Sequence, residues 1–302
     1  MSWIILAIIG HLANAAAFII DKTLLASTWK SSATYAALIG GMSAVVLLAS
    51  PWVHTWPQGQ ALLSSTIFGG MFVIAIWAFF EALRRAEASR VVPIVGSVIP
   101  MLTLLGTTTL LGEQITTRIA FGFICLLVAT YVLSRGSAHN RLDGRTILIA
   151  LLSAACFAIA SVAGKDAFTR SSFLGVFVAS RGIAAGVAIL VGVFVHDARK
   201  ELRALFSFKK HANAPSGSLG LTIVGQACGS LGFILVNAAI AAGSAALVNA
   251  LQAVQYATIV LVAWIGGGRL QRILQEDMSR QALLLKGGAI SLVGLGLWLV
   301  AG

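Results

Sequence analysis

Apolar residues in this chain do not alternate with polar ones but gather in ten long runs separated by polar or Gly/Pro-containing breaks. Runs of about 20 apolar residues are long enough to cross a bilayer as helices. Hydrocarbon offers the backbone no hydrogen-bond partner, so a helix is the structure that satisfies each run internally. The pattern predicts an all-α integral membrane protein with ten transmembrane helices, over residues 2–21, 32–51, 61–82, 91–111, 117–134, 146–166, 172–195, 217–240, 244–266 and 281–301.

Composition supports this class. Of 302 residues, 58% are hydrophobic and only 10% are charged, which is far from the balance of a water-soluble domain. The first residues, MSWIILAIIG, lack the basic region of a signal peptide and are interpreted as the start of the first span. Cys125, Cys156 and Cys228 lie in three separate apolar runs, so their spacing predicts neither a metal site nor a disulfide framework.

The net charge of +11 indicates membrane topology and no nucleic-acid partner, because the basic residues are concentrated in alternate loops. The loops after the first, third, fifth, seventh and ninth spans hold 17 Lys and Arg residues, and the other loops hold three. Arg181 is then the one basic residue left inside a predicted span. The positive-inside rule places the basic loops in the cytoplasm and both termini outside.

The chain divides into two halves of five spans each. Residues 1–135 form the first predicted repeat, residues 136–145 a polar cytoplasmic linker, and residues 146–302 the second repeat. Five spans per half require the two repeats to be inverted in the membrane. Weak similarity between the halves aligns Lys22 with Lys165, each at the end of the first helix of its half.

Polar side chains recur within three predicted spans at spacings that place them on one helical face. They are His11 and Asn14 in the first span, Gln226 and Asn237 in the eighth, and Asn249, Gln252 and Tyr256 in the ninth. Such stripes avoid lipid, and two interpretations stay open: hydrogen bonds between packed helices, or the lining of a wet cavity. A histidine at mid-span adds a third option, proton coupling, beside that of a neutral ring bonded to a neighbouring helix.

Other spans carry isolated candidates. Trp77 precedes Glu81 by one turn and could border a cavity, whereas Glu81 is close enough to Arg84 and Arg85 to predict an interfacial ion-pair cluster. The fourth span contains Ser97 and two prolines, which permit a bend and free backbone carbonyl groups.

Arg181 needs a partner inside the membrane. An ion pair or carbonyl contact within the bundle and direct binding of cargo are the two interpretations of this residue.

Catalytic motifs are not part of this sequence: it has no GxSxG, HExxH, Walker or dinucleotide-binding pattern. The sequence therefore predicts no enzyme, no cofactor and no metal site. Without a Walker loop, transport driven by this chain would use a gradient or facilitated diffusion.

The stretch ASRVVPIVGSVIPMLTLLGTTTLLGEQITTRIAFGFICLLVATYVLS resembles the fourth and fifth helices of EamA-type carriers in the drug/metabolite transporter superfamily. Gly112 and Glu113 match the Gly-Glu pair of that family, and Lys22, Lys165 and Arg181 match recurrent cations. The second half lacks the pair, and Glu276 takes its place in a longer loop over 266–286. The resemblance implies a secondary transporter in the bacterial inner membrane.

By this resemblance the cargo is a small, amino-acid-like metabolite exported by alternating access through a central cavity between the first, third, fourth, sixth, eighth and ninth spans. The candidate substrate-binding residues are His11, Asn14, Trp77, Ser97, Arg181, Gln226, Asn237, Asn249, Gln252 and Tyr256. One alternative is a flippase for an anionic lipid-linked substrate such as a polyprenyl-phosphate sugar, since cationic residues suit a phosphate. The other is a membrane scaffold that transports nothing.

Overall fold

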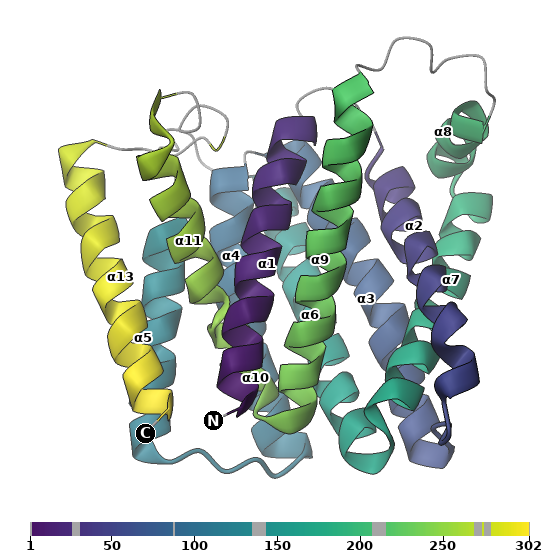
Figure 1. Ribbon diagram of the computed structural model, residues 1–302, viewed down its shortest axis with the longest axis horizontal. Helices are drawn as coiled ribbons and strands as arrows, with labels where there is room; N and C mark the ends of the chain where they lie inside the picture. The colour runs from purple at the N-terminus through teal and green to yellow at the C-terminus, as the bar shows by residue number, and fades with distance from the viewer. Residues whose placement is uncertain are drawn as a thin grey trace. The chain divides into compact units, whose positions relative to one another are not determined.

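The computed structural model describes residues 2–25, 31–86, 88–134, 143–206, 216–268, 274 and 279–301, and within these ranges the chain is helical with no strand (Figure 1). The chain forms two compact units. The first unit comprises Met1–Thr28, Ala86–Asp143 and Ser216–Gly302, and the second comprises Trp29–Arg85 and Gly144–Pro215. Each unit combines segments from both sequence halves, so the predicted inverted repeat, which relates one half to the other, stays a prediction.

The first unit is a bundle of seven described helices: α1 (Ser2–Leu25), α4 (Ala88–Leu110), α5 (Thr117–Ser134), α9 (Ser216–Ala242), α10 (Ala245–Ala250), α11 (Gln252–Ile265) and α13 (Arg280–Ala301). Within it, α1 packs along α9, α5 along α13, and α4 against α5 and α10. The chain begins and ends at the same end of this unit (Figure 1). Small residues allow α1 and α9 to pack closely, because a Cβ added at Gly10 would lie only 3.0 Å from Val236.

The second unit contains α2 (Ser32–Met42), which continues as the 3₁₀-helix η1 (Ser43–Trp52), then α3 (Gly59–Arg85), α6 (Gly144–Arg170), α7 (Phe173–Phe194) and α8 (His196–Phe206). Here α3 packs between α6 and α7, and α2 packs on α7. Val73, Ala184 and Ala188 form the core of the α3–α7 contact.

Eight helical segments of the described chain are long and apolar enough to cross a membrane. They are Ser2–Ile20, Ser32–Trp52, Gly59–Arg85, Gly144–Arg170, Phe173–Phe194, Val224–Ala242, Ala245–Ile265 and Arg280–Val300. The predicted spans at 91–111 and 117–134 are also helical, but their apolar parts are shorter, Ile94–Leu110 and Thr117–Leu133. Ten membrane crossings therefore stay a prediction, while a multi-pass, all-helical membrane protein is confirmed.

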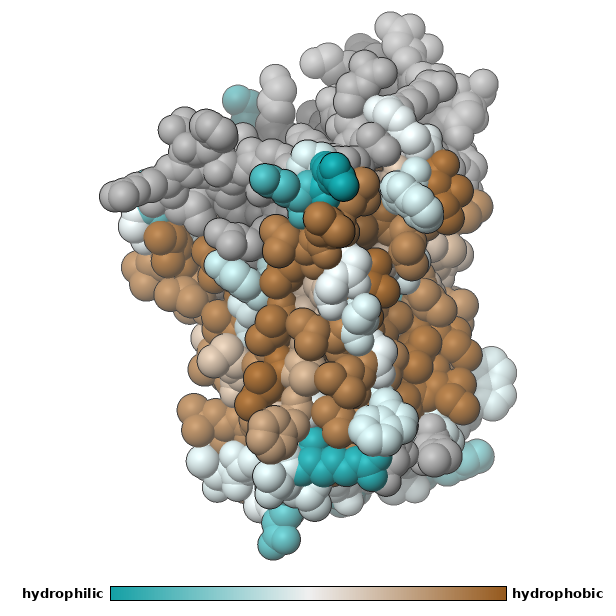
Figure 2. Space-filling model, turned by 90° about the vertical axis from the view of Figure 1, so that its left-hand side faces the viewer, coloured by the Kyte–Doolittle hydropathy of each residue, from teal (hydrophilic) through white to brown (hydrophobic). Residues whose placement is uncertain are grey.

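The face shown in Figure 2 has an apolar band with hydrophilic residues at both ends. Large apolar side chains are exposed on α5, at Phe121, Ile124 and Val128, and on α13, at Leu284 and Trp298. A surface of this kind is compatible with lipid and costly in water.

The structure has two helical features that the hydropathy pattern does not predict. The loop after the seventh span contains α8, an amphipathic helix whose Ala198 is buried and whose Arg199, Lys200 and Arg203 are exposed. Leu202 of α8 packs at Gly192 of α7, which explains why this basic segment folds back as a helix. The second feature is an interruption inside the predicted span 244–266, whose bounds agree with the apolar segment Ala245–Ile265.

Candidate functional site

The ninth predicted span is broken within the first unit. Helix α10 ends at Ala250, Leu251 adopts φ −64° and ψ −5°, and α11 begins at Gln252. The Val254 amide donates to the Leu251 carbonyl at 2.9 Å, so the chain tightens by one residue at this point. Breaks in membrane helices place backbone polar groups where another part of the protein must satisfy them.

His11 of α1 satisfies one such group. Its Nε2 lies 2.9 Å from the Val248 carbonyl oxygen, three residues before the break, and the imidazole ring is buried. Because a carbonyl only accepts hydrogen bonds, the hydrogen of this bond is on Nε2. His11 therefore ties α1 to the C-terminal turn of α10.

Replacing His11 with phenylalanine should destabilise the first unit by about 1 kcal/mol, because the Val248 carbonyl would lose its donor in a nonaqueous interior. The expected readout is a lower apparent Tm of the purified protein in detergent. Leu12→Phe is the matched control, since Leu12 is an exposed apolar neighbour on the same helix. An unchanged Tm for His11→Phe would show that the bond contributes nothing to stability.

Amide and hydroxyl side chains join the broken segment to α4. Asn249 donates from Nδ2 to Thr103 Oγ1 at 3.1 Å, and Gln252 donates from Nε2 to Tyr256 Oη at 3.1 Å. The Tyr256 hydroxyl lies against Gly96, where an added Cβ would be only 2.8 Å from Oη. Asn249 and Gln252 are half-buried, whereas Tyr256 is buried. We call Asn249, Gln252, Tyr256 and Thr103 the amide cluster.

The remaining predicted polar residues of the first unit make different contacts. Asn14 packs directly against Gly232 at the α1–α9 contact. Asn237 is buried and donates to the Phe233 carbonyl of its own helix at 2.8 Å. Ser97 donates to the Ile94 carbonyl at 3.3 Å, and Gln226 is half-buried on α9.

Glu113 holds the start of α10. Gly112 has φ +67°, a left-handed conformation that favours glycine and ends the turn after α4. The Glu113 carboxylate accepts a 3.0 Å hydrogen bond from Ser244 Oγ, and Ser244 is the N-cap of α10. Lys165 is half-buried on α6, and the side chains of Lys22 and Glu276 lie outside the described residues.

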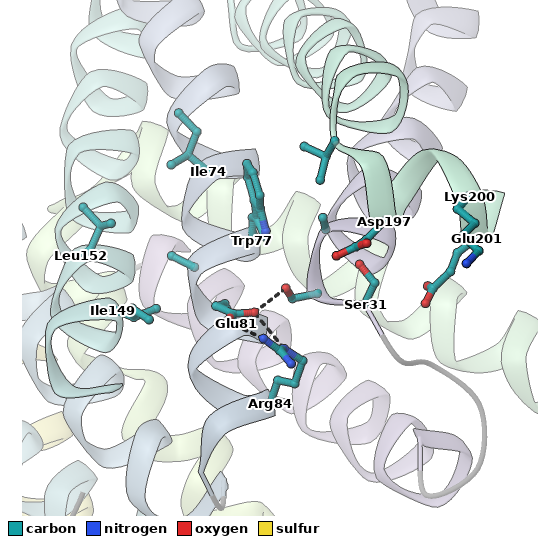
Figure 3. A pocket seen from close by; sticks show the side chains of 14 residues that line it. Ser31, Ile74, Trp77, Glu81, Arg84, Ile149, Leu152, Asp197, Lys200 and Glu201 are labelled. Carbon is teal, nitrogen blue, oxygen red and sulfur yellow. Dashed lines mark hydrogen bonds and ion pairs between the residues drawn. The ribbon is translucent and has the colours of Figure 1, made fainter. Parts of the chain in front are cut away.

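The second unit contains a cavity of about 1010 Å³ at the end where Arg84 and Arg85 close α3 (Figure 3). It is lined by Ser31, Ser32, Ala33, Ile74, Trp77, Ala78, Glu81, Arg84, Ile149, Leu152, Val195, Asp197, Lys200 and Glu201. Of the ten predicted substrate-binding residues, Trp77 is the one that lines it. The cavity is therefore built by α2, α3, α6 and α8, a different set from the predicted central cavity.

Glu81 is the centre of an ionic cluster at this cavity, as the sequence predicted. Its carboxylate accepts hydrogen bonds from Arg84 Nη2 at 2.8 Å, Arg85 Nε at 2.7 Å and Ser32 Oγ at 2.8 Å. The cluster connects α3 with the first turn of α2 and compensates the charge of Glu81.

Arg181 of α7 lies among aromatic rings of the second unit and not at this cavity. Its guanidinium carbon is 4.4 Å from the ring centroid of Phe72, 4.9 Å from Phe68 and 5.9 Å from Phe177. The residue is only 2% exposed. Cation–π attraction is strengthened by such desolvation, so the arrangement favours the structural interpretation of Arg181.

Two buried charged residues are not indicated as such by the sequence pattern. Asp166 of α6 is buried and accepts from Ser64 Oγ at 2.6 Å and Arg170 Nε at 2.7 Å; its spacing of four residues from Arg170 was the available signal. The predicted loop over 266–286 includes Lys286, but this residue lies in α13 and is 3% exposed. Arg181 is therefore not the only basic residue inside a span. The described residues contain no group of three or more His, Cys, Asp or Glu that could hold a metal ion.

Residues 1–135 match the EamA-like transporter family. The first half of the chain is an EamA-like sequence. The match over residues 1–135 and the long apolar helices indicate a multi-pass membrane transporter of the drug/metabolite transporter type. A solved structure titled "Crystal structure of protein" is similar over 98% of this chain and 95% of its own, with a TM-score of 0.66 and 17% sequence identity, which shows a shared fold. No curated protein matches the sequence significantly.

Proposed function

We propose that this EamA-like protein is a secondary carrier of the bacterial inner membrane that exports a small, amino-acid-like metabolite by alternating access. The observation that carries the proposal is the broken α10–α11 segment with the amide cluster beside it. Substrate sites of secondary transporters are typically formed by discontinuous helices, whose backbone and side-chain polar groups meet the cargo.

The contacts of the amide cluster are weak enough to be exchanged. Hydrogen bonds between neutral side chains in membrane proteins contribute about 1 kcal/mol or less. A substrate carboxylate or ammonium makes charge-assisted hydrogen bonds of about twice the strength of neutral ones. Asn249 and Gln252 can therefore leave Thr103 and Tyr256 for a charged substrate group at a net gain. His11 and Glu113 hold α10 from its two ends during this exchange.

Transport by purified protein in liposomes tests this proposal. Replacing Asn249 or Gln252 with alanine should reduce the flux of labelled amino acids by about tenfold, equivalent to one lost contact of about 1.4 kcal/mol. Thr258→Val is the matched control, because Thr258 bonds only to the Val254 carbonyl of its own helix among the described contacts. Unchanged flux in both alanine variants would assign the cluster to helix packing, as expected for a scaffold.

The helix pairing supports the inverted repeat as part of this proposal. If the two halves correspond, α1 is equivalent to α6, and α3 to α9. The α1–α9 contact of the first unit then has its counterpart in the α6–α3 contact of the second unit, and both are extensive. The basic residues at the cavity end of the second unit, such as Arg84, Arg85 and Arg199, support a cytoplasmic location for that end and an outside location for both termini.

A further inference from the structure

We propose that the cavity of the second unit is an entry site for zwitterionic small molecules with a bulky apolar side chain. The inference deepens the proposed carrier function, on which it rests, by naming the class of cargo and the place where it first binds. Binding of such a ligand requires an apolar surface, an anionic group and a cationic group within one cavity of suitable size.

One wall of the cavity is apolar. Ile74 and Trp77 of α3 and Ile149 and Leu152 of α6 line it, and Figure 3 shows the α6 side chains across the cavity from α8, with Trp77 between them. The volume of about 1010 Å³ is at the upper end of the range of small-molecule sites, which is about 300–1,000 Å³. A bulky aliphatic or aromatic side chain therefore has both the space and an apolar surface against which to pack.

The opposite wall carries both signs of charge. Asp197, Lys200 and Glu201 come from the first turns of α8, and Arg84 comes from the end of α3. Glu81 is paired with Arg84 and Arg85. Asp197 and Glu201 also line the cavity and form no ion pair among the described residues, so they are the carboxylates that can accept a ligand ammonium. Glu81 engages two of the guanidinium nitrogens of Arg84, and this leaves other N–H donors of the same guanidinium for a ligand carboxylate. Lys200 of α8 is the second cation that lines the cavity.

Mixed charge selects for ligands that themselves carry both charges. A pure cation would meet Arg84 and Lys200, and a pure anion would meet Asp197 and Glu201, whereas a zwitterion can pair with both sets. The cavity is at the basic end of the second unit, the end that the positive-inside rule assigns to the cytoplasm. An exporter would collect its cargo at that side.

Competition binding tests the ligand class. Full-length protein in nanodiscs would be incubated with radiolabelled L-phenylalanine and competed with phenethylamine, 3-phenylpropionate or glycine. Phenethylamine retains the aromatic ring and the ammonium, 3-phenylpropionate retains the ring and the carboxylate, and glycine retains both charges without the side chain. We expect each to compete at least about tenfold less well than phenylalanine.

The variant Asp197→Asn/Glu201→Gln identifies the site. It should weaken phenylalanine binding and raise the KM of transport by about five- to tenfold with little change in kcat, and it should improve 3-phenylpropionate relative to phenylalanine. Arg199→Gln is the matched control, because Arg199 is an exposed residue of the same helix that does not line the cavity. A purely structural role of the two acids would not reverse the preference among ligands.

The outcomes separate this inference from the carrier function. If the double variant transports phenylalanine with an unaltered KM and an unaltered ligand preference, the entry-site proposal is overturned and the carrier proposal stands. Variant-sensitive binding of phenylalanine without any flux in liposomes would support the entry site and overturn the carrier. Absence of phenylalanine binding, together with flux of other labelled amino acids, would overturn the entry site and leave the carrier. Absence of both phenylalanine binding and flux of any labelled amino acid in the wild-type protein would overturn both.

Discussion

Replacing Gly69 with alanine should destabilise the second unit by about 3 kcal/mol, at the upper end of the cost of overpacking a core. An added Cβ at Gly69 would overlap the carbonyl oxygen of Ser180 on α7 and would be 3.0 Å from its carbonyl carbon and 3.2 Å from the Ala184 amide nitrogen. These are backbone atoms and cannot rotate away, so α3 and α7 would have to separate. We expect a large drop in apparent Tm in detergent and a low yield of monodisperse protein.

Gly70→Ala is the control for this prediction, one residue further along the same helix. Among the described residues, no heavy atom apart from its chain neighbours and the backbone of its own helix lies within 4 Å of a Cβ added at Gly70. Alanine is also the better helix former by about 1 kcal/mol, so Gly70→Ala should leave the Tm unchanged or raise it. Equal stability of the two variants would contradict the close α3–α7 contact.

The positions of the helices could be predicted from the sequence because an apolar run in a bilayer has only one way to satisfy its backbone. The predicted span 61–82 corresponds to Gly59–Arg85, and 146–166 corresponds to Gly144–Arg170. Each helix extends beyond its apolar run by a few residues, such as Arg84 and Arg85 at the end of α3. At these ends the hydropathy falls before the helical hydrogen bonds stop.

Interruptions of helices could not be predicted in this way. The break at Leu251 has no proline or glycine, and the carbonyl before it is satisfied by His11, 237 residues away in sequence. Helix α8 was missed because its apolar face is only a few residues wide, and it folds against Gly192 of α7. Both features depend on contacts between elements and not on local composition.

In the candidate site, too, local sequence determines some features and contacts between helices determine others. Helical spacing correctly paired Gln252 with Tyr256, since that pairing follows from the geometry of α11, whereas Asn249 lies on α10 before the break. Spacing could not reveal that Thr103 is the partner of Asn249, or that Asn237 would bond to its own helix. Which partner a polar group finds is decided by helix packing.

Arg181→Ala should destabilise the second unit by about 3 kcal/mol, because truncation leaves a cavity and removes cation–π contacts worth about 1 kcal/mol or more each when desolvated. The side chain lies over Phe68, Phe72 and Phe177 and is buried. Thermal unfolding in detergent measures the loss. Arg181→Met, which fills most of the same space without a charge to desolvate, should recover most of the Tm.

The methionine variant also separates the two interpretations of Arg181. If the guanidinium serves the packing of α3 and α7, Arg181→Met should transport at close to the wild-type rate in liposomes, because the space among the rings stays filled. If the guanidinium binds an anionic group of the cargo, the variant would fold normally and lose transport, since methionine cannot pair with a carboxylate or phosphate. The second result would contradict the aromatic enclosure as the main role of Arg181 and would assign the guanidinium to an anionic group of the cargo, a carboxylate or a phosphate.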